Sequence, residues 1–222
     1  MTNTKTRSSR KIPDVETLQK GNGYKMILEL DFNEIIPFVF SNIRKASLSS
    51  FFYLIINFAS LVFIIGYALW SVNAGHTGIG RVILQVLAGI LAGSILVIPP
   101  HELLHGLAYR ILGARNIKFG VDLQQFIFYV TAHRFPISKR ELAFLAMTPF
   151  VIINLVLIVI TVLWAPRITL LSASLLLSHN IMCIGDFAMI SYAFRQKQEL
   201  YTFDDTEKKR SYFFERKDQV LS

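Results

Sequence analysis

The sequence predicts an all-α polytopic membrane protein, with about four transmembrane helices and a short β-hairpin on the cytoplasmic side. The first observation is composition: the 222 residues are 53% hydrophobic, with a mean hydropathy of +0.46, above what soluble domains usually carry. The second is that only 17% of the residues are charged, against about 25% in soluble proteins. The third is that these charges flank long uncharged stretches. Together they disfavour a soluble single domain.

Four apolar stretches are long enough to cross a hydrocarbon core of about 30 Å, which requires about 20 helical residues. They cover residues 51–72, 82–100, 142–164 and 168–193. The first three contain no charged residue, and the fourth contains only Asp186. Buried helices of a soluble bundle would need charged outer faces, which these stretches lack. We therefore expect four membrane spans.

The basic residues predict the orientation of these spans. Of the 23 Lys and Arg residues, 21 lie before residue 51, between 110 and 140, or after 193. The positive-inside rule therefore places both termini and the central loop in the cytoplasm. The predicted protein is a multi-pass integral membrane protein, which we assign to the cell membrane of a bacterium.

Three regions are expected along the chain. Residues 1–50 form a cytoplasmic tail, in which 31–43 make a short helix on the membrane surface. Residues 51–193 form the membrane-embedded domain, and 194–222 form a solvated or surface-associated cytoplasmic tail. Between the second and third spans, residues 119–132 alternate in part with a period of two and are rich in aromatic and β-branched side chains, which predicts a strand or hairpin.

The net charge of +8 is explained by membrane topology rather than by nucleic acid, because no nucleic-acid motif accompanies it. The expected partners are the lipid bilayer and a membrane protein or peptide substrate. The only cysteine, Cys183, lies in an apolar stretch, so the chain has no partner for a disulfide within itself.

A chemical motif follows the second span directly: His101 and His105 enclose Glu102 in the pattern HExxH, which is typical of zinc peptidases. On a helix the two histidines lie about 40° apart, so both imidazoles can reach one ion. Glu102 points about 100° away from His101, which suits proton transfer better than ligation. Pro99 and Pro100 break the preceding span, so a new helical segment is expected to start near His101.

A catalytic zinc usually has three protein ligands. Asp186 is the first candidate for the third, because it is the only carboxylate inside a span and reaches the same depth as His101 in helical rise. His133 and Glu141 are alternatives if the cytoplasmic loop folds back. His179 and Asn180 lie farther toward the outside, where they could donate supporting hydrogen bonds or simply pack between helices. One Zn²⁺ per chain is expected.

The chain resembles a known family through three segments: HELLHGLAYR after the second span, PISKRELAFLAMTPF entering the third, and IGDF in the fourth. These are similar to the putative zincin peptidase family of membrane proteins, which looks similar to site-2 proteases. The resemblance implies zinc ligation by His101 and His105, a catalytic Glu102, and Asp186 as third ligand. The chain lacks the Asn-Pro element of site-2 proteases and has Gly185-Asp186-Phe187 where they have Asp-Gly.

These observations predict a zinc-dependent membrane metalloendopeptidase that hydrolyses peptide bonds near the cytoplasmic membrane face. Glu102 would act as the general base and then the general acid. The alternatives are a non-catalytic membrane protein that binds or transports a metal, for which Glu102 would be dispensable, and an inactive scaffold, for which the histidines would be dispensable too.

Overall fold

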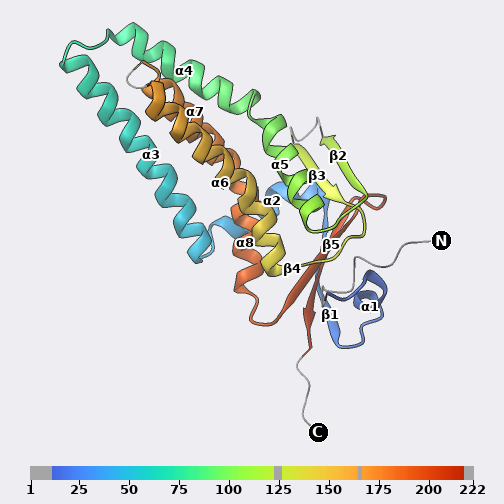
Figure 1. Ribbon diagram of the computed structural model, residues 1–222. Helices are drawn as coiled ribbons and strands as arrows, with labels where there is room; N and C mark the ends of the chain where they lie inside the picture. Colours follow the sequence, from blue (N-terminus) through green and yellow to red (C-terminus); the bar gives the residue numbers. More distant parts are fainter. Residues whose placement is uncertain (1–11, 123–126, 165–166, 218–222) are drawn as a thin grey trace.

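The computed structural model describes residues 12–122, 127–164 and 167–217. Long apolar helices occupy one half of the molecule, and short strands gather beside one end of them (Figure 1). The long helices are α3 (Leu48–Asn73), α4 (Ile79–Ile95), α6 (Lys139–Trp164) and α7 (Thr169–Met182). The helix α7 is central among them, because it contacts α3, α4 and α6.

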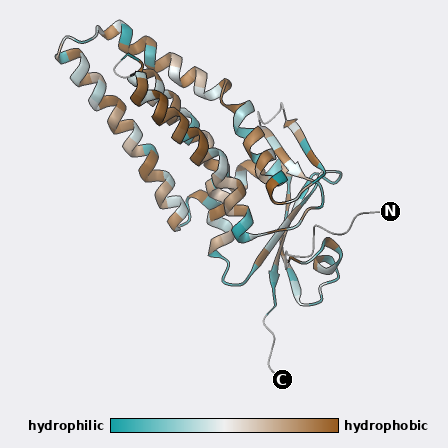
Figure 2. Cartoon of the chain, viewed as in Figure 1, coloured by the Kyte–Doolittle hydropathy of each residue, from teal (hydrophilic) through white to brown (hydrophobic). Residues whose placement is uncertain are grey.

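Within the part of the chain that the structure describes, three helical segments are long and apolar enough to cross a membrane, and a bent pair could supply a fourth crossing. The segments are Leu48–Asn73, Ile79–Ile111 and Lys139–Trp164, and the pair is Thr169–Met182 with Ile184–Arg195. Many large apolar side chains of these helices are exposed, and the helices are largely brown, the colour of hydrophobic residues, in Figure 2. Four spans were predicted from the sequence; the described residues contain three, or four if the bent pair is one span.

Both breaks in these helices lie next to residues of the predicted metal centre. The helix α4 ends at Ile95, and α5 (Ile98–Ile111) begins with two prolines in its first turn. This confirms the predicted break, because proline lacks the N–H that a helix interior requires but is accommodated in a first turn. The second break falls at Cys183, where α7 meets α8 (Ile184–Arg195) at an angle of 43°.

A four-stranded antiparallel sheet lies beside the helical part. Its strand order is β1-β6-β5-β4, with β1 at Tyr24–Asp31, β6 at Arg210–Arg216, β5 at Leu200–Asp205 and β4 at Ile137–Ser138. Leu30, Leu200 and Phe213 bury one face of it against the end of α8. The other face is covered by α1 (Val15–Gln19), whose Leu18 is fully buried.

The prediction of a solvated or surface-associated C-terminal tail was wrong for Leu200–Arg216, which forms β5 and β6. The prediction relied on the charged residues of this segment and overlooked the aromatic residues between them. These pair across the two strands, Tyr201 with Phe214 and Phe203 with Tyr212. Strand β1 in turn takes its partner from β6, far away in the chain. These pairings make the protein mainly helical with a small sheet, rather than all-α.

Two smaller predictions agree with the structure. The strands β2 (Ile117–Asp122) and β3 (Ile127–Ala132) form the predicted hairpin, which packs on α5. A short helix, α2 (Ile35–Ile43), follows the turn η1 (Phe32–Glu34) within the stretch predicted to be helical. Its buried side chains Val39 and Ile43 pack against α8.

Candidate metal centre

The two histidines of the HExxH motif lie one turn apart on the buried face of α5. Only 4% of His101 and 8% of His105 are exposed. The α5 helix starts at Ile98, after the break from α4, so the motif begins in the first turn of a new helix rather than deep inside a continuous one. The break therefore sets the position of both imidazoles.

Asp186 lies in the first turn of α8 and meets the two histidines from the opposite side. Its Oδ1 is 3.3 Å from His105 Nε2, and its Oδ2 is 3.4 Å from His101 Nε2. The two Nε2 atoms are 3.1 Å from each other. The structure thus brings together the three residues that the sequence analysis placed first as metal ligands.

These separations fit a zinc ion. Around a tetrahedral zinc with bonds of about 2.0–2.1 Å, neighbouring ligand atoms lie about 3.3 Å apart. Two imidazole nitrogens and a carboxylate oxygen are also the donor types that catalytic zinc sites use, with a further position left for water or substrate. Two neutral imidazoles and one carboxylate would leave a divalent ion with a net charge of +1, which lowers the cost of burying it.

The orientation of His105 is set by a backbone carbonyl. Its Nδ1 lies 3.1 Å from the oxygen of Leu145 on α6. A carbonyl oxygen only accepts, so His105 Nδ1 must carry the proton and donate it. The Nε2 lone pair is then free and faces Asp186, which is how a supporting hydrogen bond fixes the tautomer of a metal ligand.

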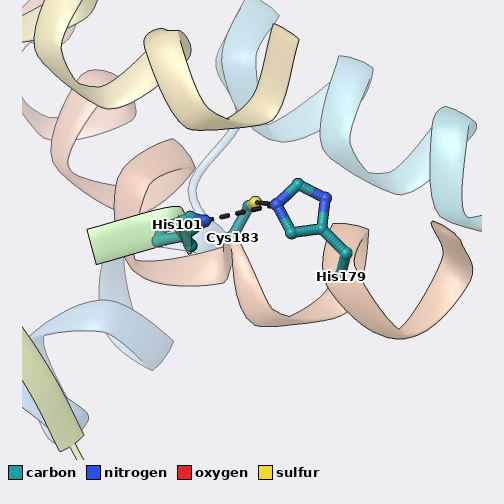
Figure 3. Close-up of side chains that lie close together, drawn as sticks. All are labelled: His101, His179 and Cys183. Atoms are coloured by element: carbon teal, nitrogen blue, oxygen red, sulfur yellow. Dashed lines mark hydrogen bonds between the residues drawn. The ribbon is translucent and has the colours of Figure 1, made fainter. Parts of the chain in front are cut away.

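His179 contacts the other histidine of the motif. Its Nε2 lies 3.2 Å from His101 Nδ1 and 3.6 Å from the sulfur of Cys183, as the close-up in Figure 3 shows. The next residue, Asn180, instead contacts α6: its Oδ1 accepts a hydrogen bond of 2.9 Å from Asn154 Nδ2. The structure therefore places His179, and not Asn180, in contact with a motif residue.

The two alternative ligands lie elsewhere. His133 groups with Asp205 and Glu207 at the turn of the β5–β6 hairpin, and its Nδ1 contacts the backbone N–H and hydroxyl of Thr206. Glu141 accepts hydrogen bonds from the N–H and hydroxyl of Ser138 at the start of α6. Among the described residues, neither belongs to a group that includes His105.

The catalytic candidate Glu102 lines the same cavity as the three ligand candidates. This cavity has a volume of about 440 Å³ and is mostly apolar, with walls from α2, α5, α8, β3 and the β5–β6 hairpin. The hairpin contributes Asp204, whose carboxylate accepts a hydrogen bond of 2.6 Å from Ser211. Glu102 also lines a second apolar cavity between α5 and the β2–β3 hairpin, so it stands where the two meet.

Sequence reasoning missed several parts of this site. The Leu145 carbonyl leaves no signal in a sequence, because every residue has one. Asn154 could have been found, since an amide within an apolar span commonly faces another helix. The sheet residues Asp204 and Ser211 were missed together with the strands that carry them.

The fold and the site define a class: a protein with membrane-length apolar helices and a zincin-type HExxH helix whose histidines meet a carboxylate from another helix. Residues 94–201 match a family model described as putative zincin peptidase. The matched segment contains the HExxH motif, the β2–β3 hairpin and Asp186. None of the curated proteins or solved structures matches the chain significantly.

Proposed function

We propose that this chain is a zinc-dependent endopeptidase that is embedded in a membrane and hydrolyses peptide bonds near its cytoplasmic face. The observation that carries the proposal is the meeting of His101, His105 and Asp186, whose facing ligand atoms are separated by 3.1–3.4 Å. The match of residues 94–201 to the putative zincin peptidase family supports the same chemistry.

The three ligand candidates would hold the ion, which when bound supplies a Lewis acid that polarises the scissile carbonyl and acidifies water. His105 presents a deprotonated Nε2 because its Nδ1 donates to the Leu145 carbonyl. Asp186 supplies the negative charge. Glu102 is not a member of the ligand group but shares the cavity with it, which is the arrangement that a general base requires.

Glu102 has two successive tasks in this mechanism. It first accepts a proton from the water that attacks the scissile carbonyl, and then delivers that proton to the amine that leaves. The apolar walls of the cavity limit the number of competing water molecules and receive apolar side chains of a substrate. This favours a membrane protein or an apolar peptide as the substrate class.

The distribution of charge supports the proposed placement in the membrane. The basic residues at 110–140 and after 193 lie on α5, α6, α8, the strands beside the site and the connections between them. The positive-inside rule assigns this end of the helical part to the cytoplasm. The site would then lie at the cytoplasmic boundary of the bilayer, where water and an apolar substrate segment can both reach it.

The test compares wild type with Glu102→Gln and His105→Ala in detergent micelles. Zinc content is measured by elemental analysis, and cleavage of a mixture of single-span membrane peptides is followed by mass spectrometry. We expect Glu102→Gln to retain zinc and to lose at least about 100-fold in cleavage rate, whereas His105→Ala loses both. The exposed Glu199→Gln is the matched control and should behave like wild type.

The same variants separate the competing functions. A metal-binding or transport protein would not need Glu102 for its function, and a scaffold would need neither residue. Full cleavage by Glu102→Gln would therefore exclude the proposed mechanism.

A further inference from the structure

A second group of ligand atoms lies across the ring of His101 from Asp186. It consists of His101 Nδ1, His179 Nε2 and Cys183 Sγ, which all lie within 4.8 Å of one another. His179 and Cys183 are one helical turn apart, at the end of α7 where α8 begins, and both are fully buried. Figure 3 shows the His179 ring with its Nε2 atom facing the other two residues.

The two separations from His179 Nε2 match those around a metal ion. His101 Nδ1 and His179 Nε2 are 3.2 Å apart, and His179 Nε2 and Cys183 Sγ are 3.6 Å apart. For a tetrahedral zinc with Zn–N bonds of about 2.05 Å and Zn–S bonds of about 2.3 Å, the corresponding separations are about 3.3 and 3.6 Å.

The donor types favour a softer ion than the first group does. A thiolate and two imidazoles suit zinc and similar soft cations, whereas the Asp186 carboxylate also suits harder ones. The cavity of the candidate metal centre is lined by His101 and by Met182 and Ile184, the chain neighbours of Cys183. His179 and Cys183 themselves are fully buried behind His101. We infer that His101, His179 and Cys183 form a second binding position, which takes a soft divalent cation such as Zn²⁺ or Cd²⁺.

The two positions share one residue, and this couples them. His101 faces Asp186 through Nε2 and His179 through Nδ1. A neutral imidazole has one nitrogen with a free lone pair, and the other carries a proton. An ion on Nδ1 therefore withdraws His101 from the position at Asp186. If the proposed peptidase function holds, a soft cation bound by His101, His179 and Cys183 inhibits the enzyme. The binding position itself does not depend on that function.

The test uses Cd²⁺ as the probe and the full chain in detergent micelles. Thiolate bound to Cd²⁺ absorbs in the near ultraviolet, and Cys183 is the only cysteine in the chain, so this absorption reports on one sulfur alone. We expect wild type to show it, with saturation at one thiolate-bound Cd²⁺ per chain. Cys183→Ser should lose it, and His179→Phe should weaken Cd²⁺ binding at this position at least tenfold.

Asp186→Asn distinguishes the two positions, because it removes a ligand only from the position formed by His101, His105 and Asp186. The inference predicts that this variant keeps the thiolate absorption. The inference is overturned if wild type with bound Cd²⁺, measured by elemental analysis, shows no such absorption; the trio then only holds His101 by hydrogen bonds. Loss of the absorption in Asp186→Asn also overturns it. These readouts need no substrate, so a failure to cleave peptides would contradict the proposed function and leave this test unaffected.

Discussion

Asp204 and Asp205 are consecutive residues of β5, and their carboxyl groups lie in opposite environments. Asp204 lines the cavity of the candidate metal centre and accepts hydrogen bonds from Ser211 and Tyr109. Asp205 Oδ1 instead accepts the backbone N–H groups of Glu207 and Lys208 at the hairpin turn, each at 3.1 Å. Burial raises the pKa of Asp204 despite its two hydrogen bonds. Burial would also raise the pKa of Asp205, but the two N–H donors and nearby cationic groups lower it overall.

The raised pKa of Asp204 predicts that Asp204→Asn stabilises the protein at neutral pH. A carboxyl group whose pKa is higher in the folded state favours folding at pH values below its unfolded pKa, and this contribution is lost as the pH rises through the folded pKa. Asparagine mimics the protonated form. Thermal unfolding of both proteins in micelles should show a Tm difference that is small at about pH 4 and grows toward pH 8. A constant difference over this range would contradict the assignment.

Asp205→Asn should show the opposite dependence on pH. Because the folded state lowers the pKa of Asp205, its contribution to stability is present above the unfolded pKa and is lost as the pH falls through the folded pKa. The variant should therefore have a lower Tm than wild type at pH 7, and the difference should shrink in acid. The exposed Glu199→Gln serves as control and should follow the wild-type curve.

The contrast between these neighbours illustrates what sequence reasoning could and could not reach. The helices were predictable, because about 20 consecutive apolar residues have few other stable arrangements. The meeting of His101 with Asp186 was predictable too, since helical rise fixes their depth once the spans are assigned. The sheet was not, because β1 pairs with β6 from the other end of the chain, and no local pattern in either strand specifies that partner.

The contact between His179 and His101 shows a similar limit. Sequence reasoning placed His179 farther toward the outside than the ligand candidates, and left open whether it donates supporting hydrogen bonds or packs between helices. In the structure His179 Nε2 lies 3.2 Å from His101 Nδ1, and the chain bends by 43° at Cys183, between His179 and Asp186. A bend without a proline is set by packing around it, here by the fully buried Cys183 and the neighbouring Phe187, and the sequence alone does not display it.

Asp186 should dominate the stabilisation of the protein by zinc. An ion present at about 100 times its Kd stabilises the folded state by ~2.7 kcal/mol, and a 100-fold loss of affinity reduces this to ~0.4 kcal/mol at the same concentration. For a chain of this size the difference corresponds to roughly 5–9 °C in Tm. Asp186→Asn should therefore lose most of the zinc-dependent rise in Tm, measured with and without a chelator.

The alternative ligands provide matched controls for that experiment. His133→Gln and Glu141→Gln should keep the full zinc-dependent rise, because the structure places both residues outside the group that contains Asp186. If either variant loses the rise and Asp186→Asn keeps it, the third ligand has been assigned wrongly.

Gly89 should be essential for the packing that positions the site. It lies on α4 against α7, and an added Cβ would come within 2.3 Å of the Leu171 carbonyl oxygen and 2.8 Å of Ser174 Cβ. A backbone oxygen cannot move aside as a flexible side chain can, so the two helices must separate. Because α4 leads into the helix with the HExxH motif and α7 carries His179, the separation should also disturb the contact between His101 and His179.

We therefore expect Gly89→Ala to destabilise the protein by ~1–3 kcal/mol, the usual cost of overpacking, and to weaken zinc binding as well. Gly66 on α3 is the matched control, because an added Cβ there meets no atom within 4 Å. Gly66→Ala should leave zinc affinity unchanged and raise Tm slightly, since alanine is favoured over glycine in a helix by about 1 kcal/mol. Equal changes in Tm for the two variants would show that helix propensity, and not the close approach of α4 to α7, decides the effect at Gly89.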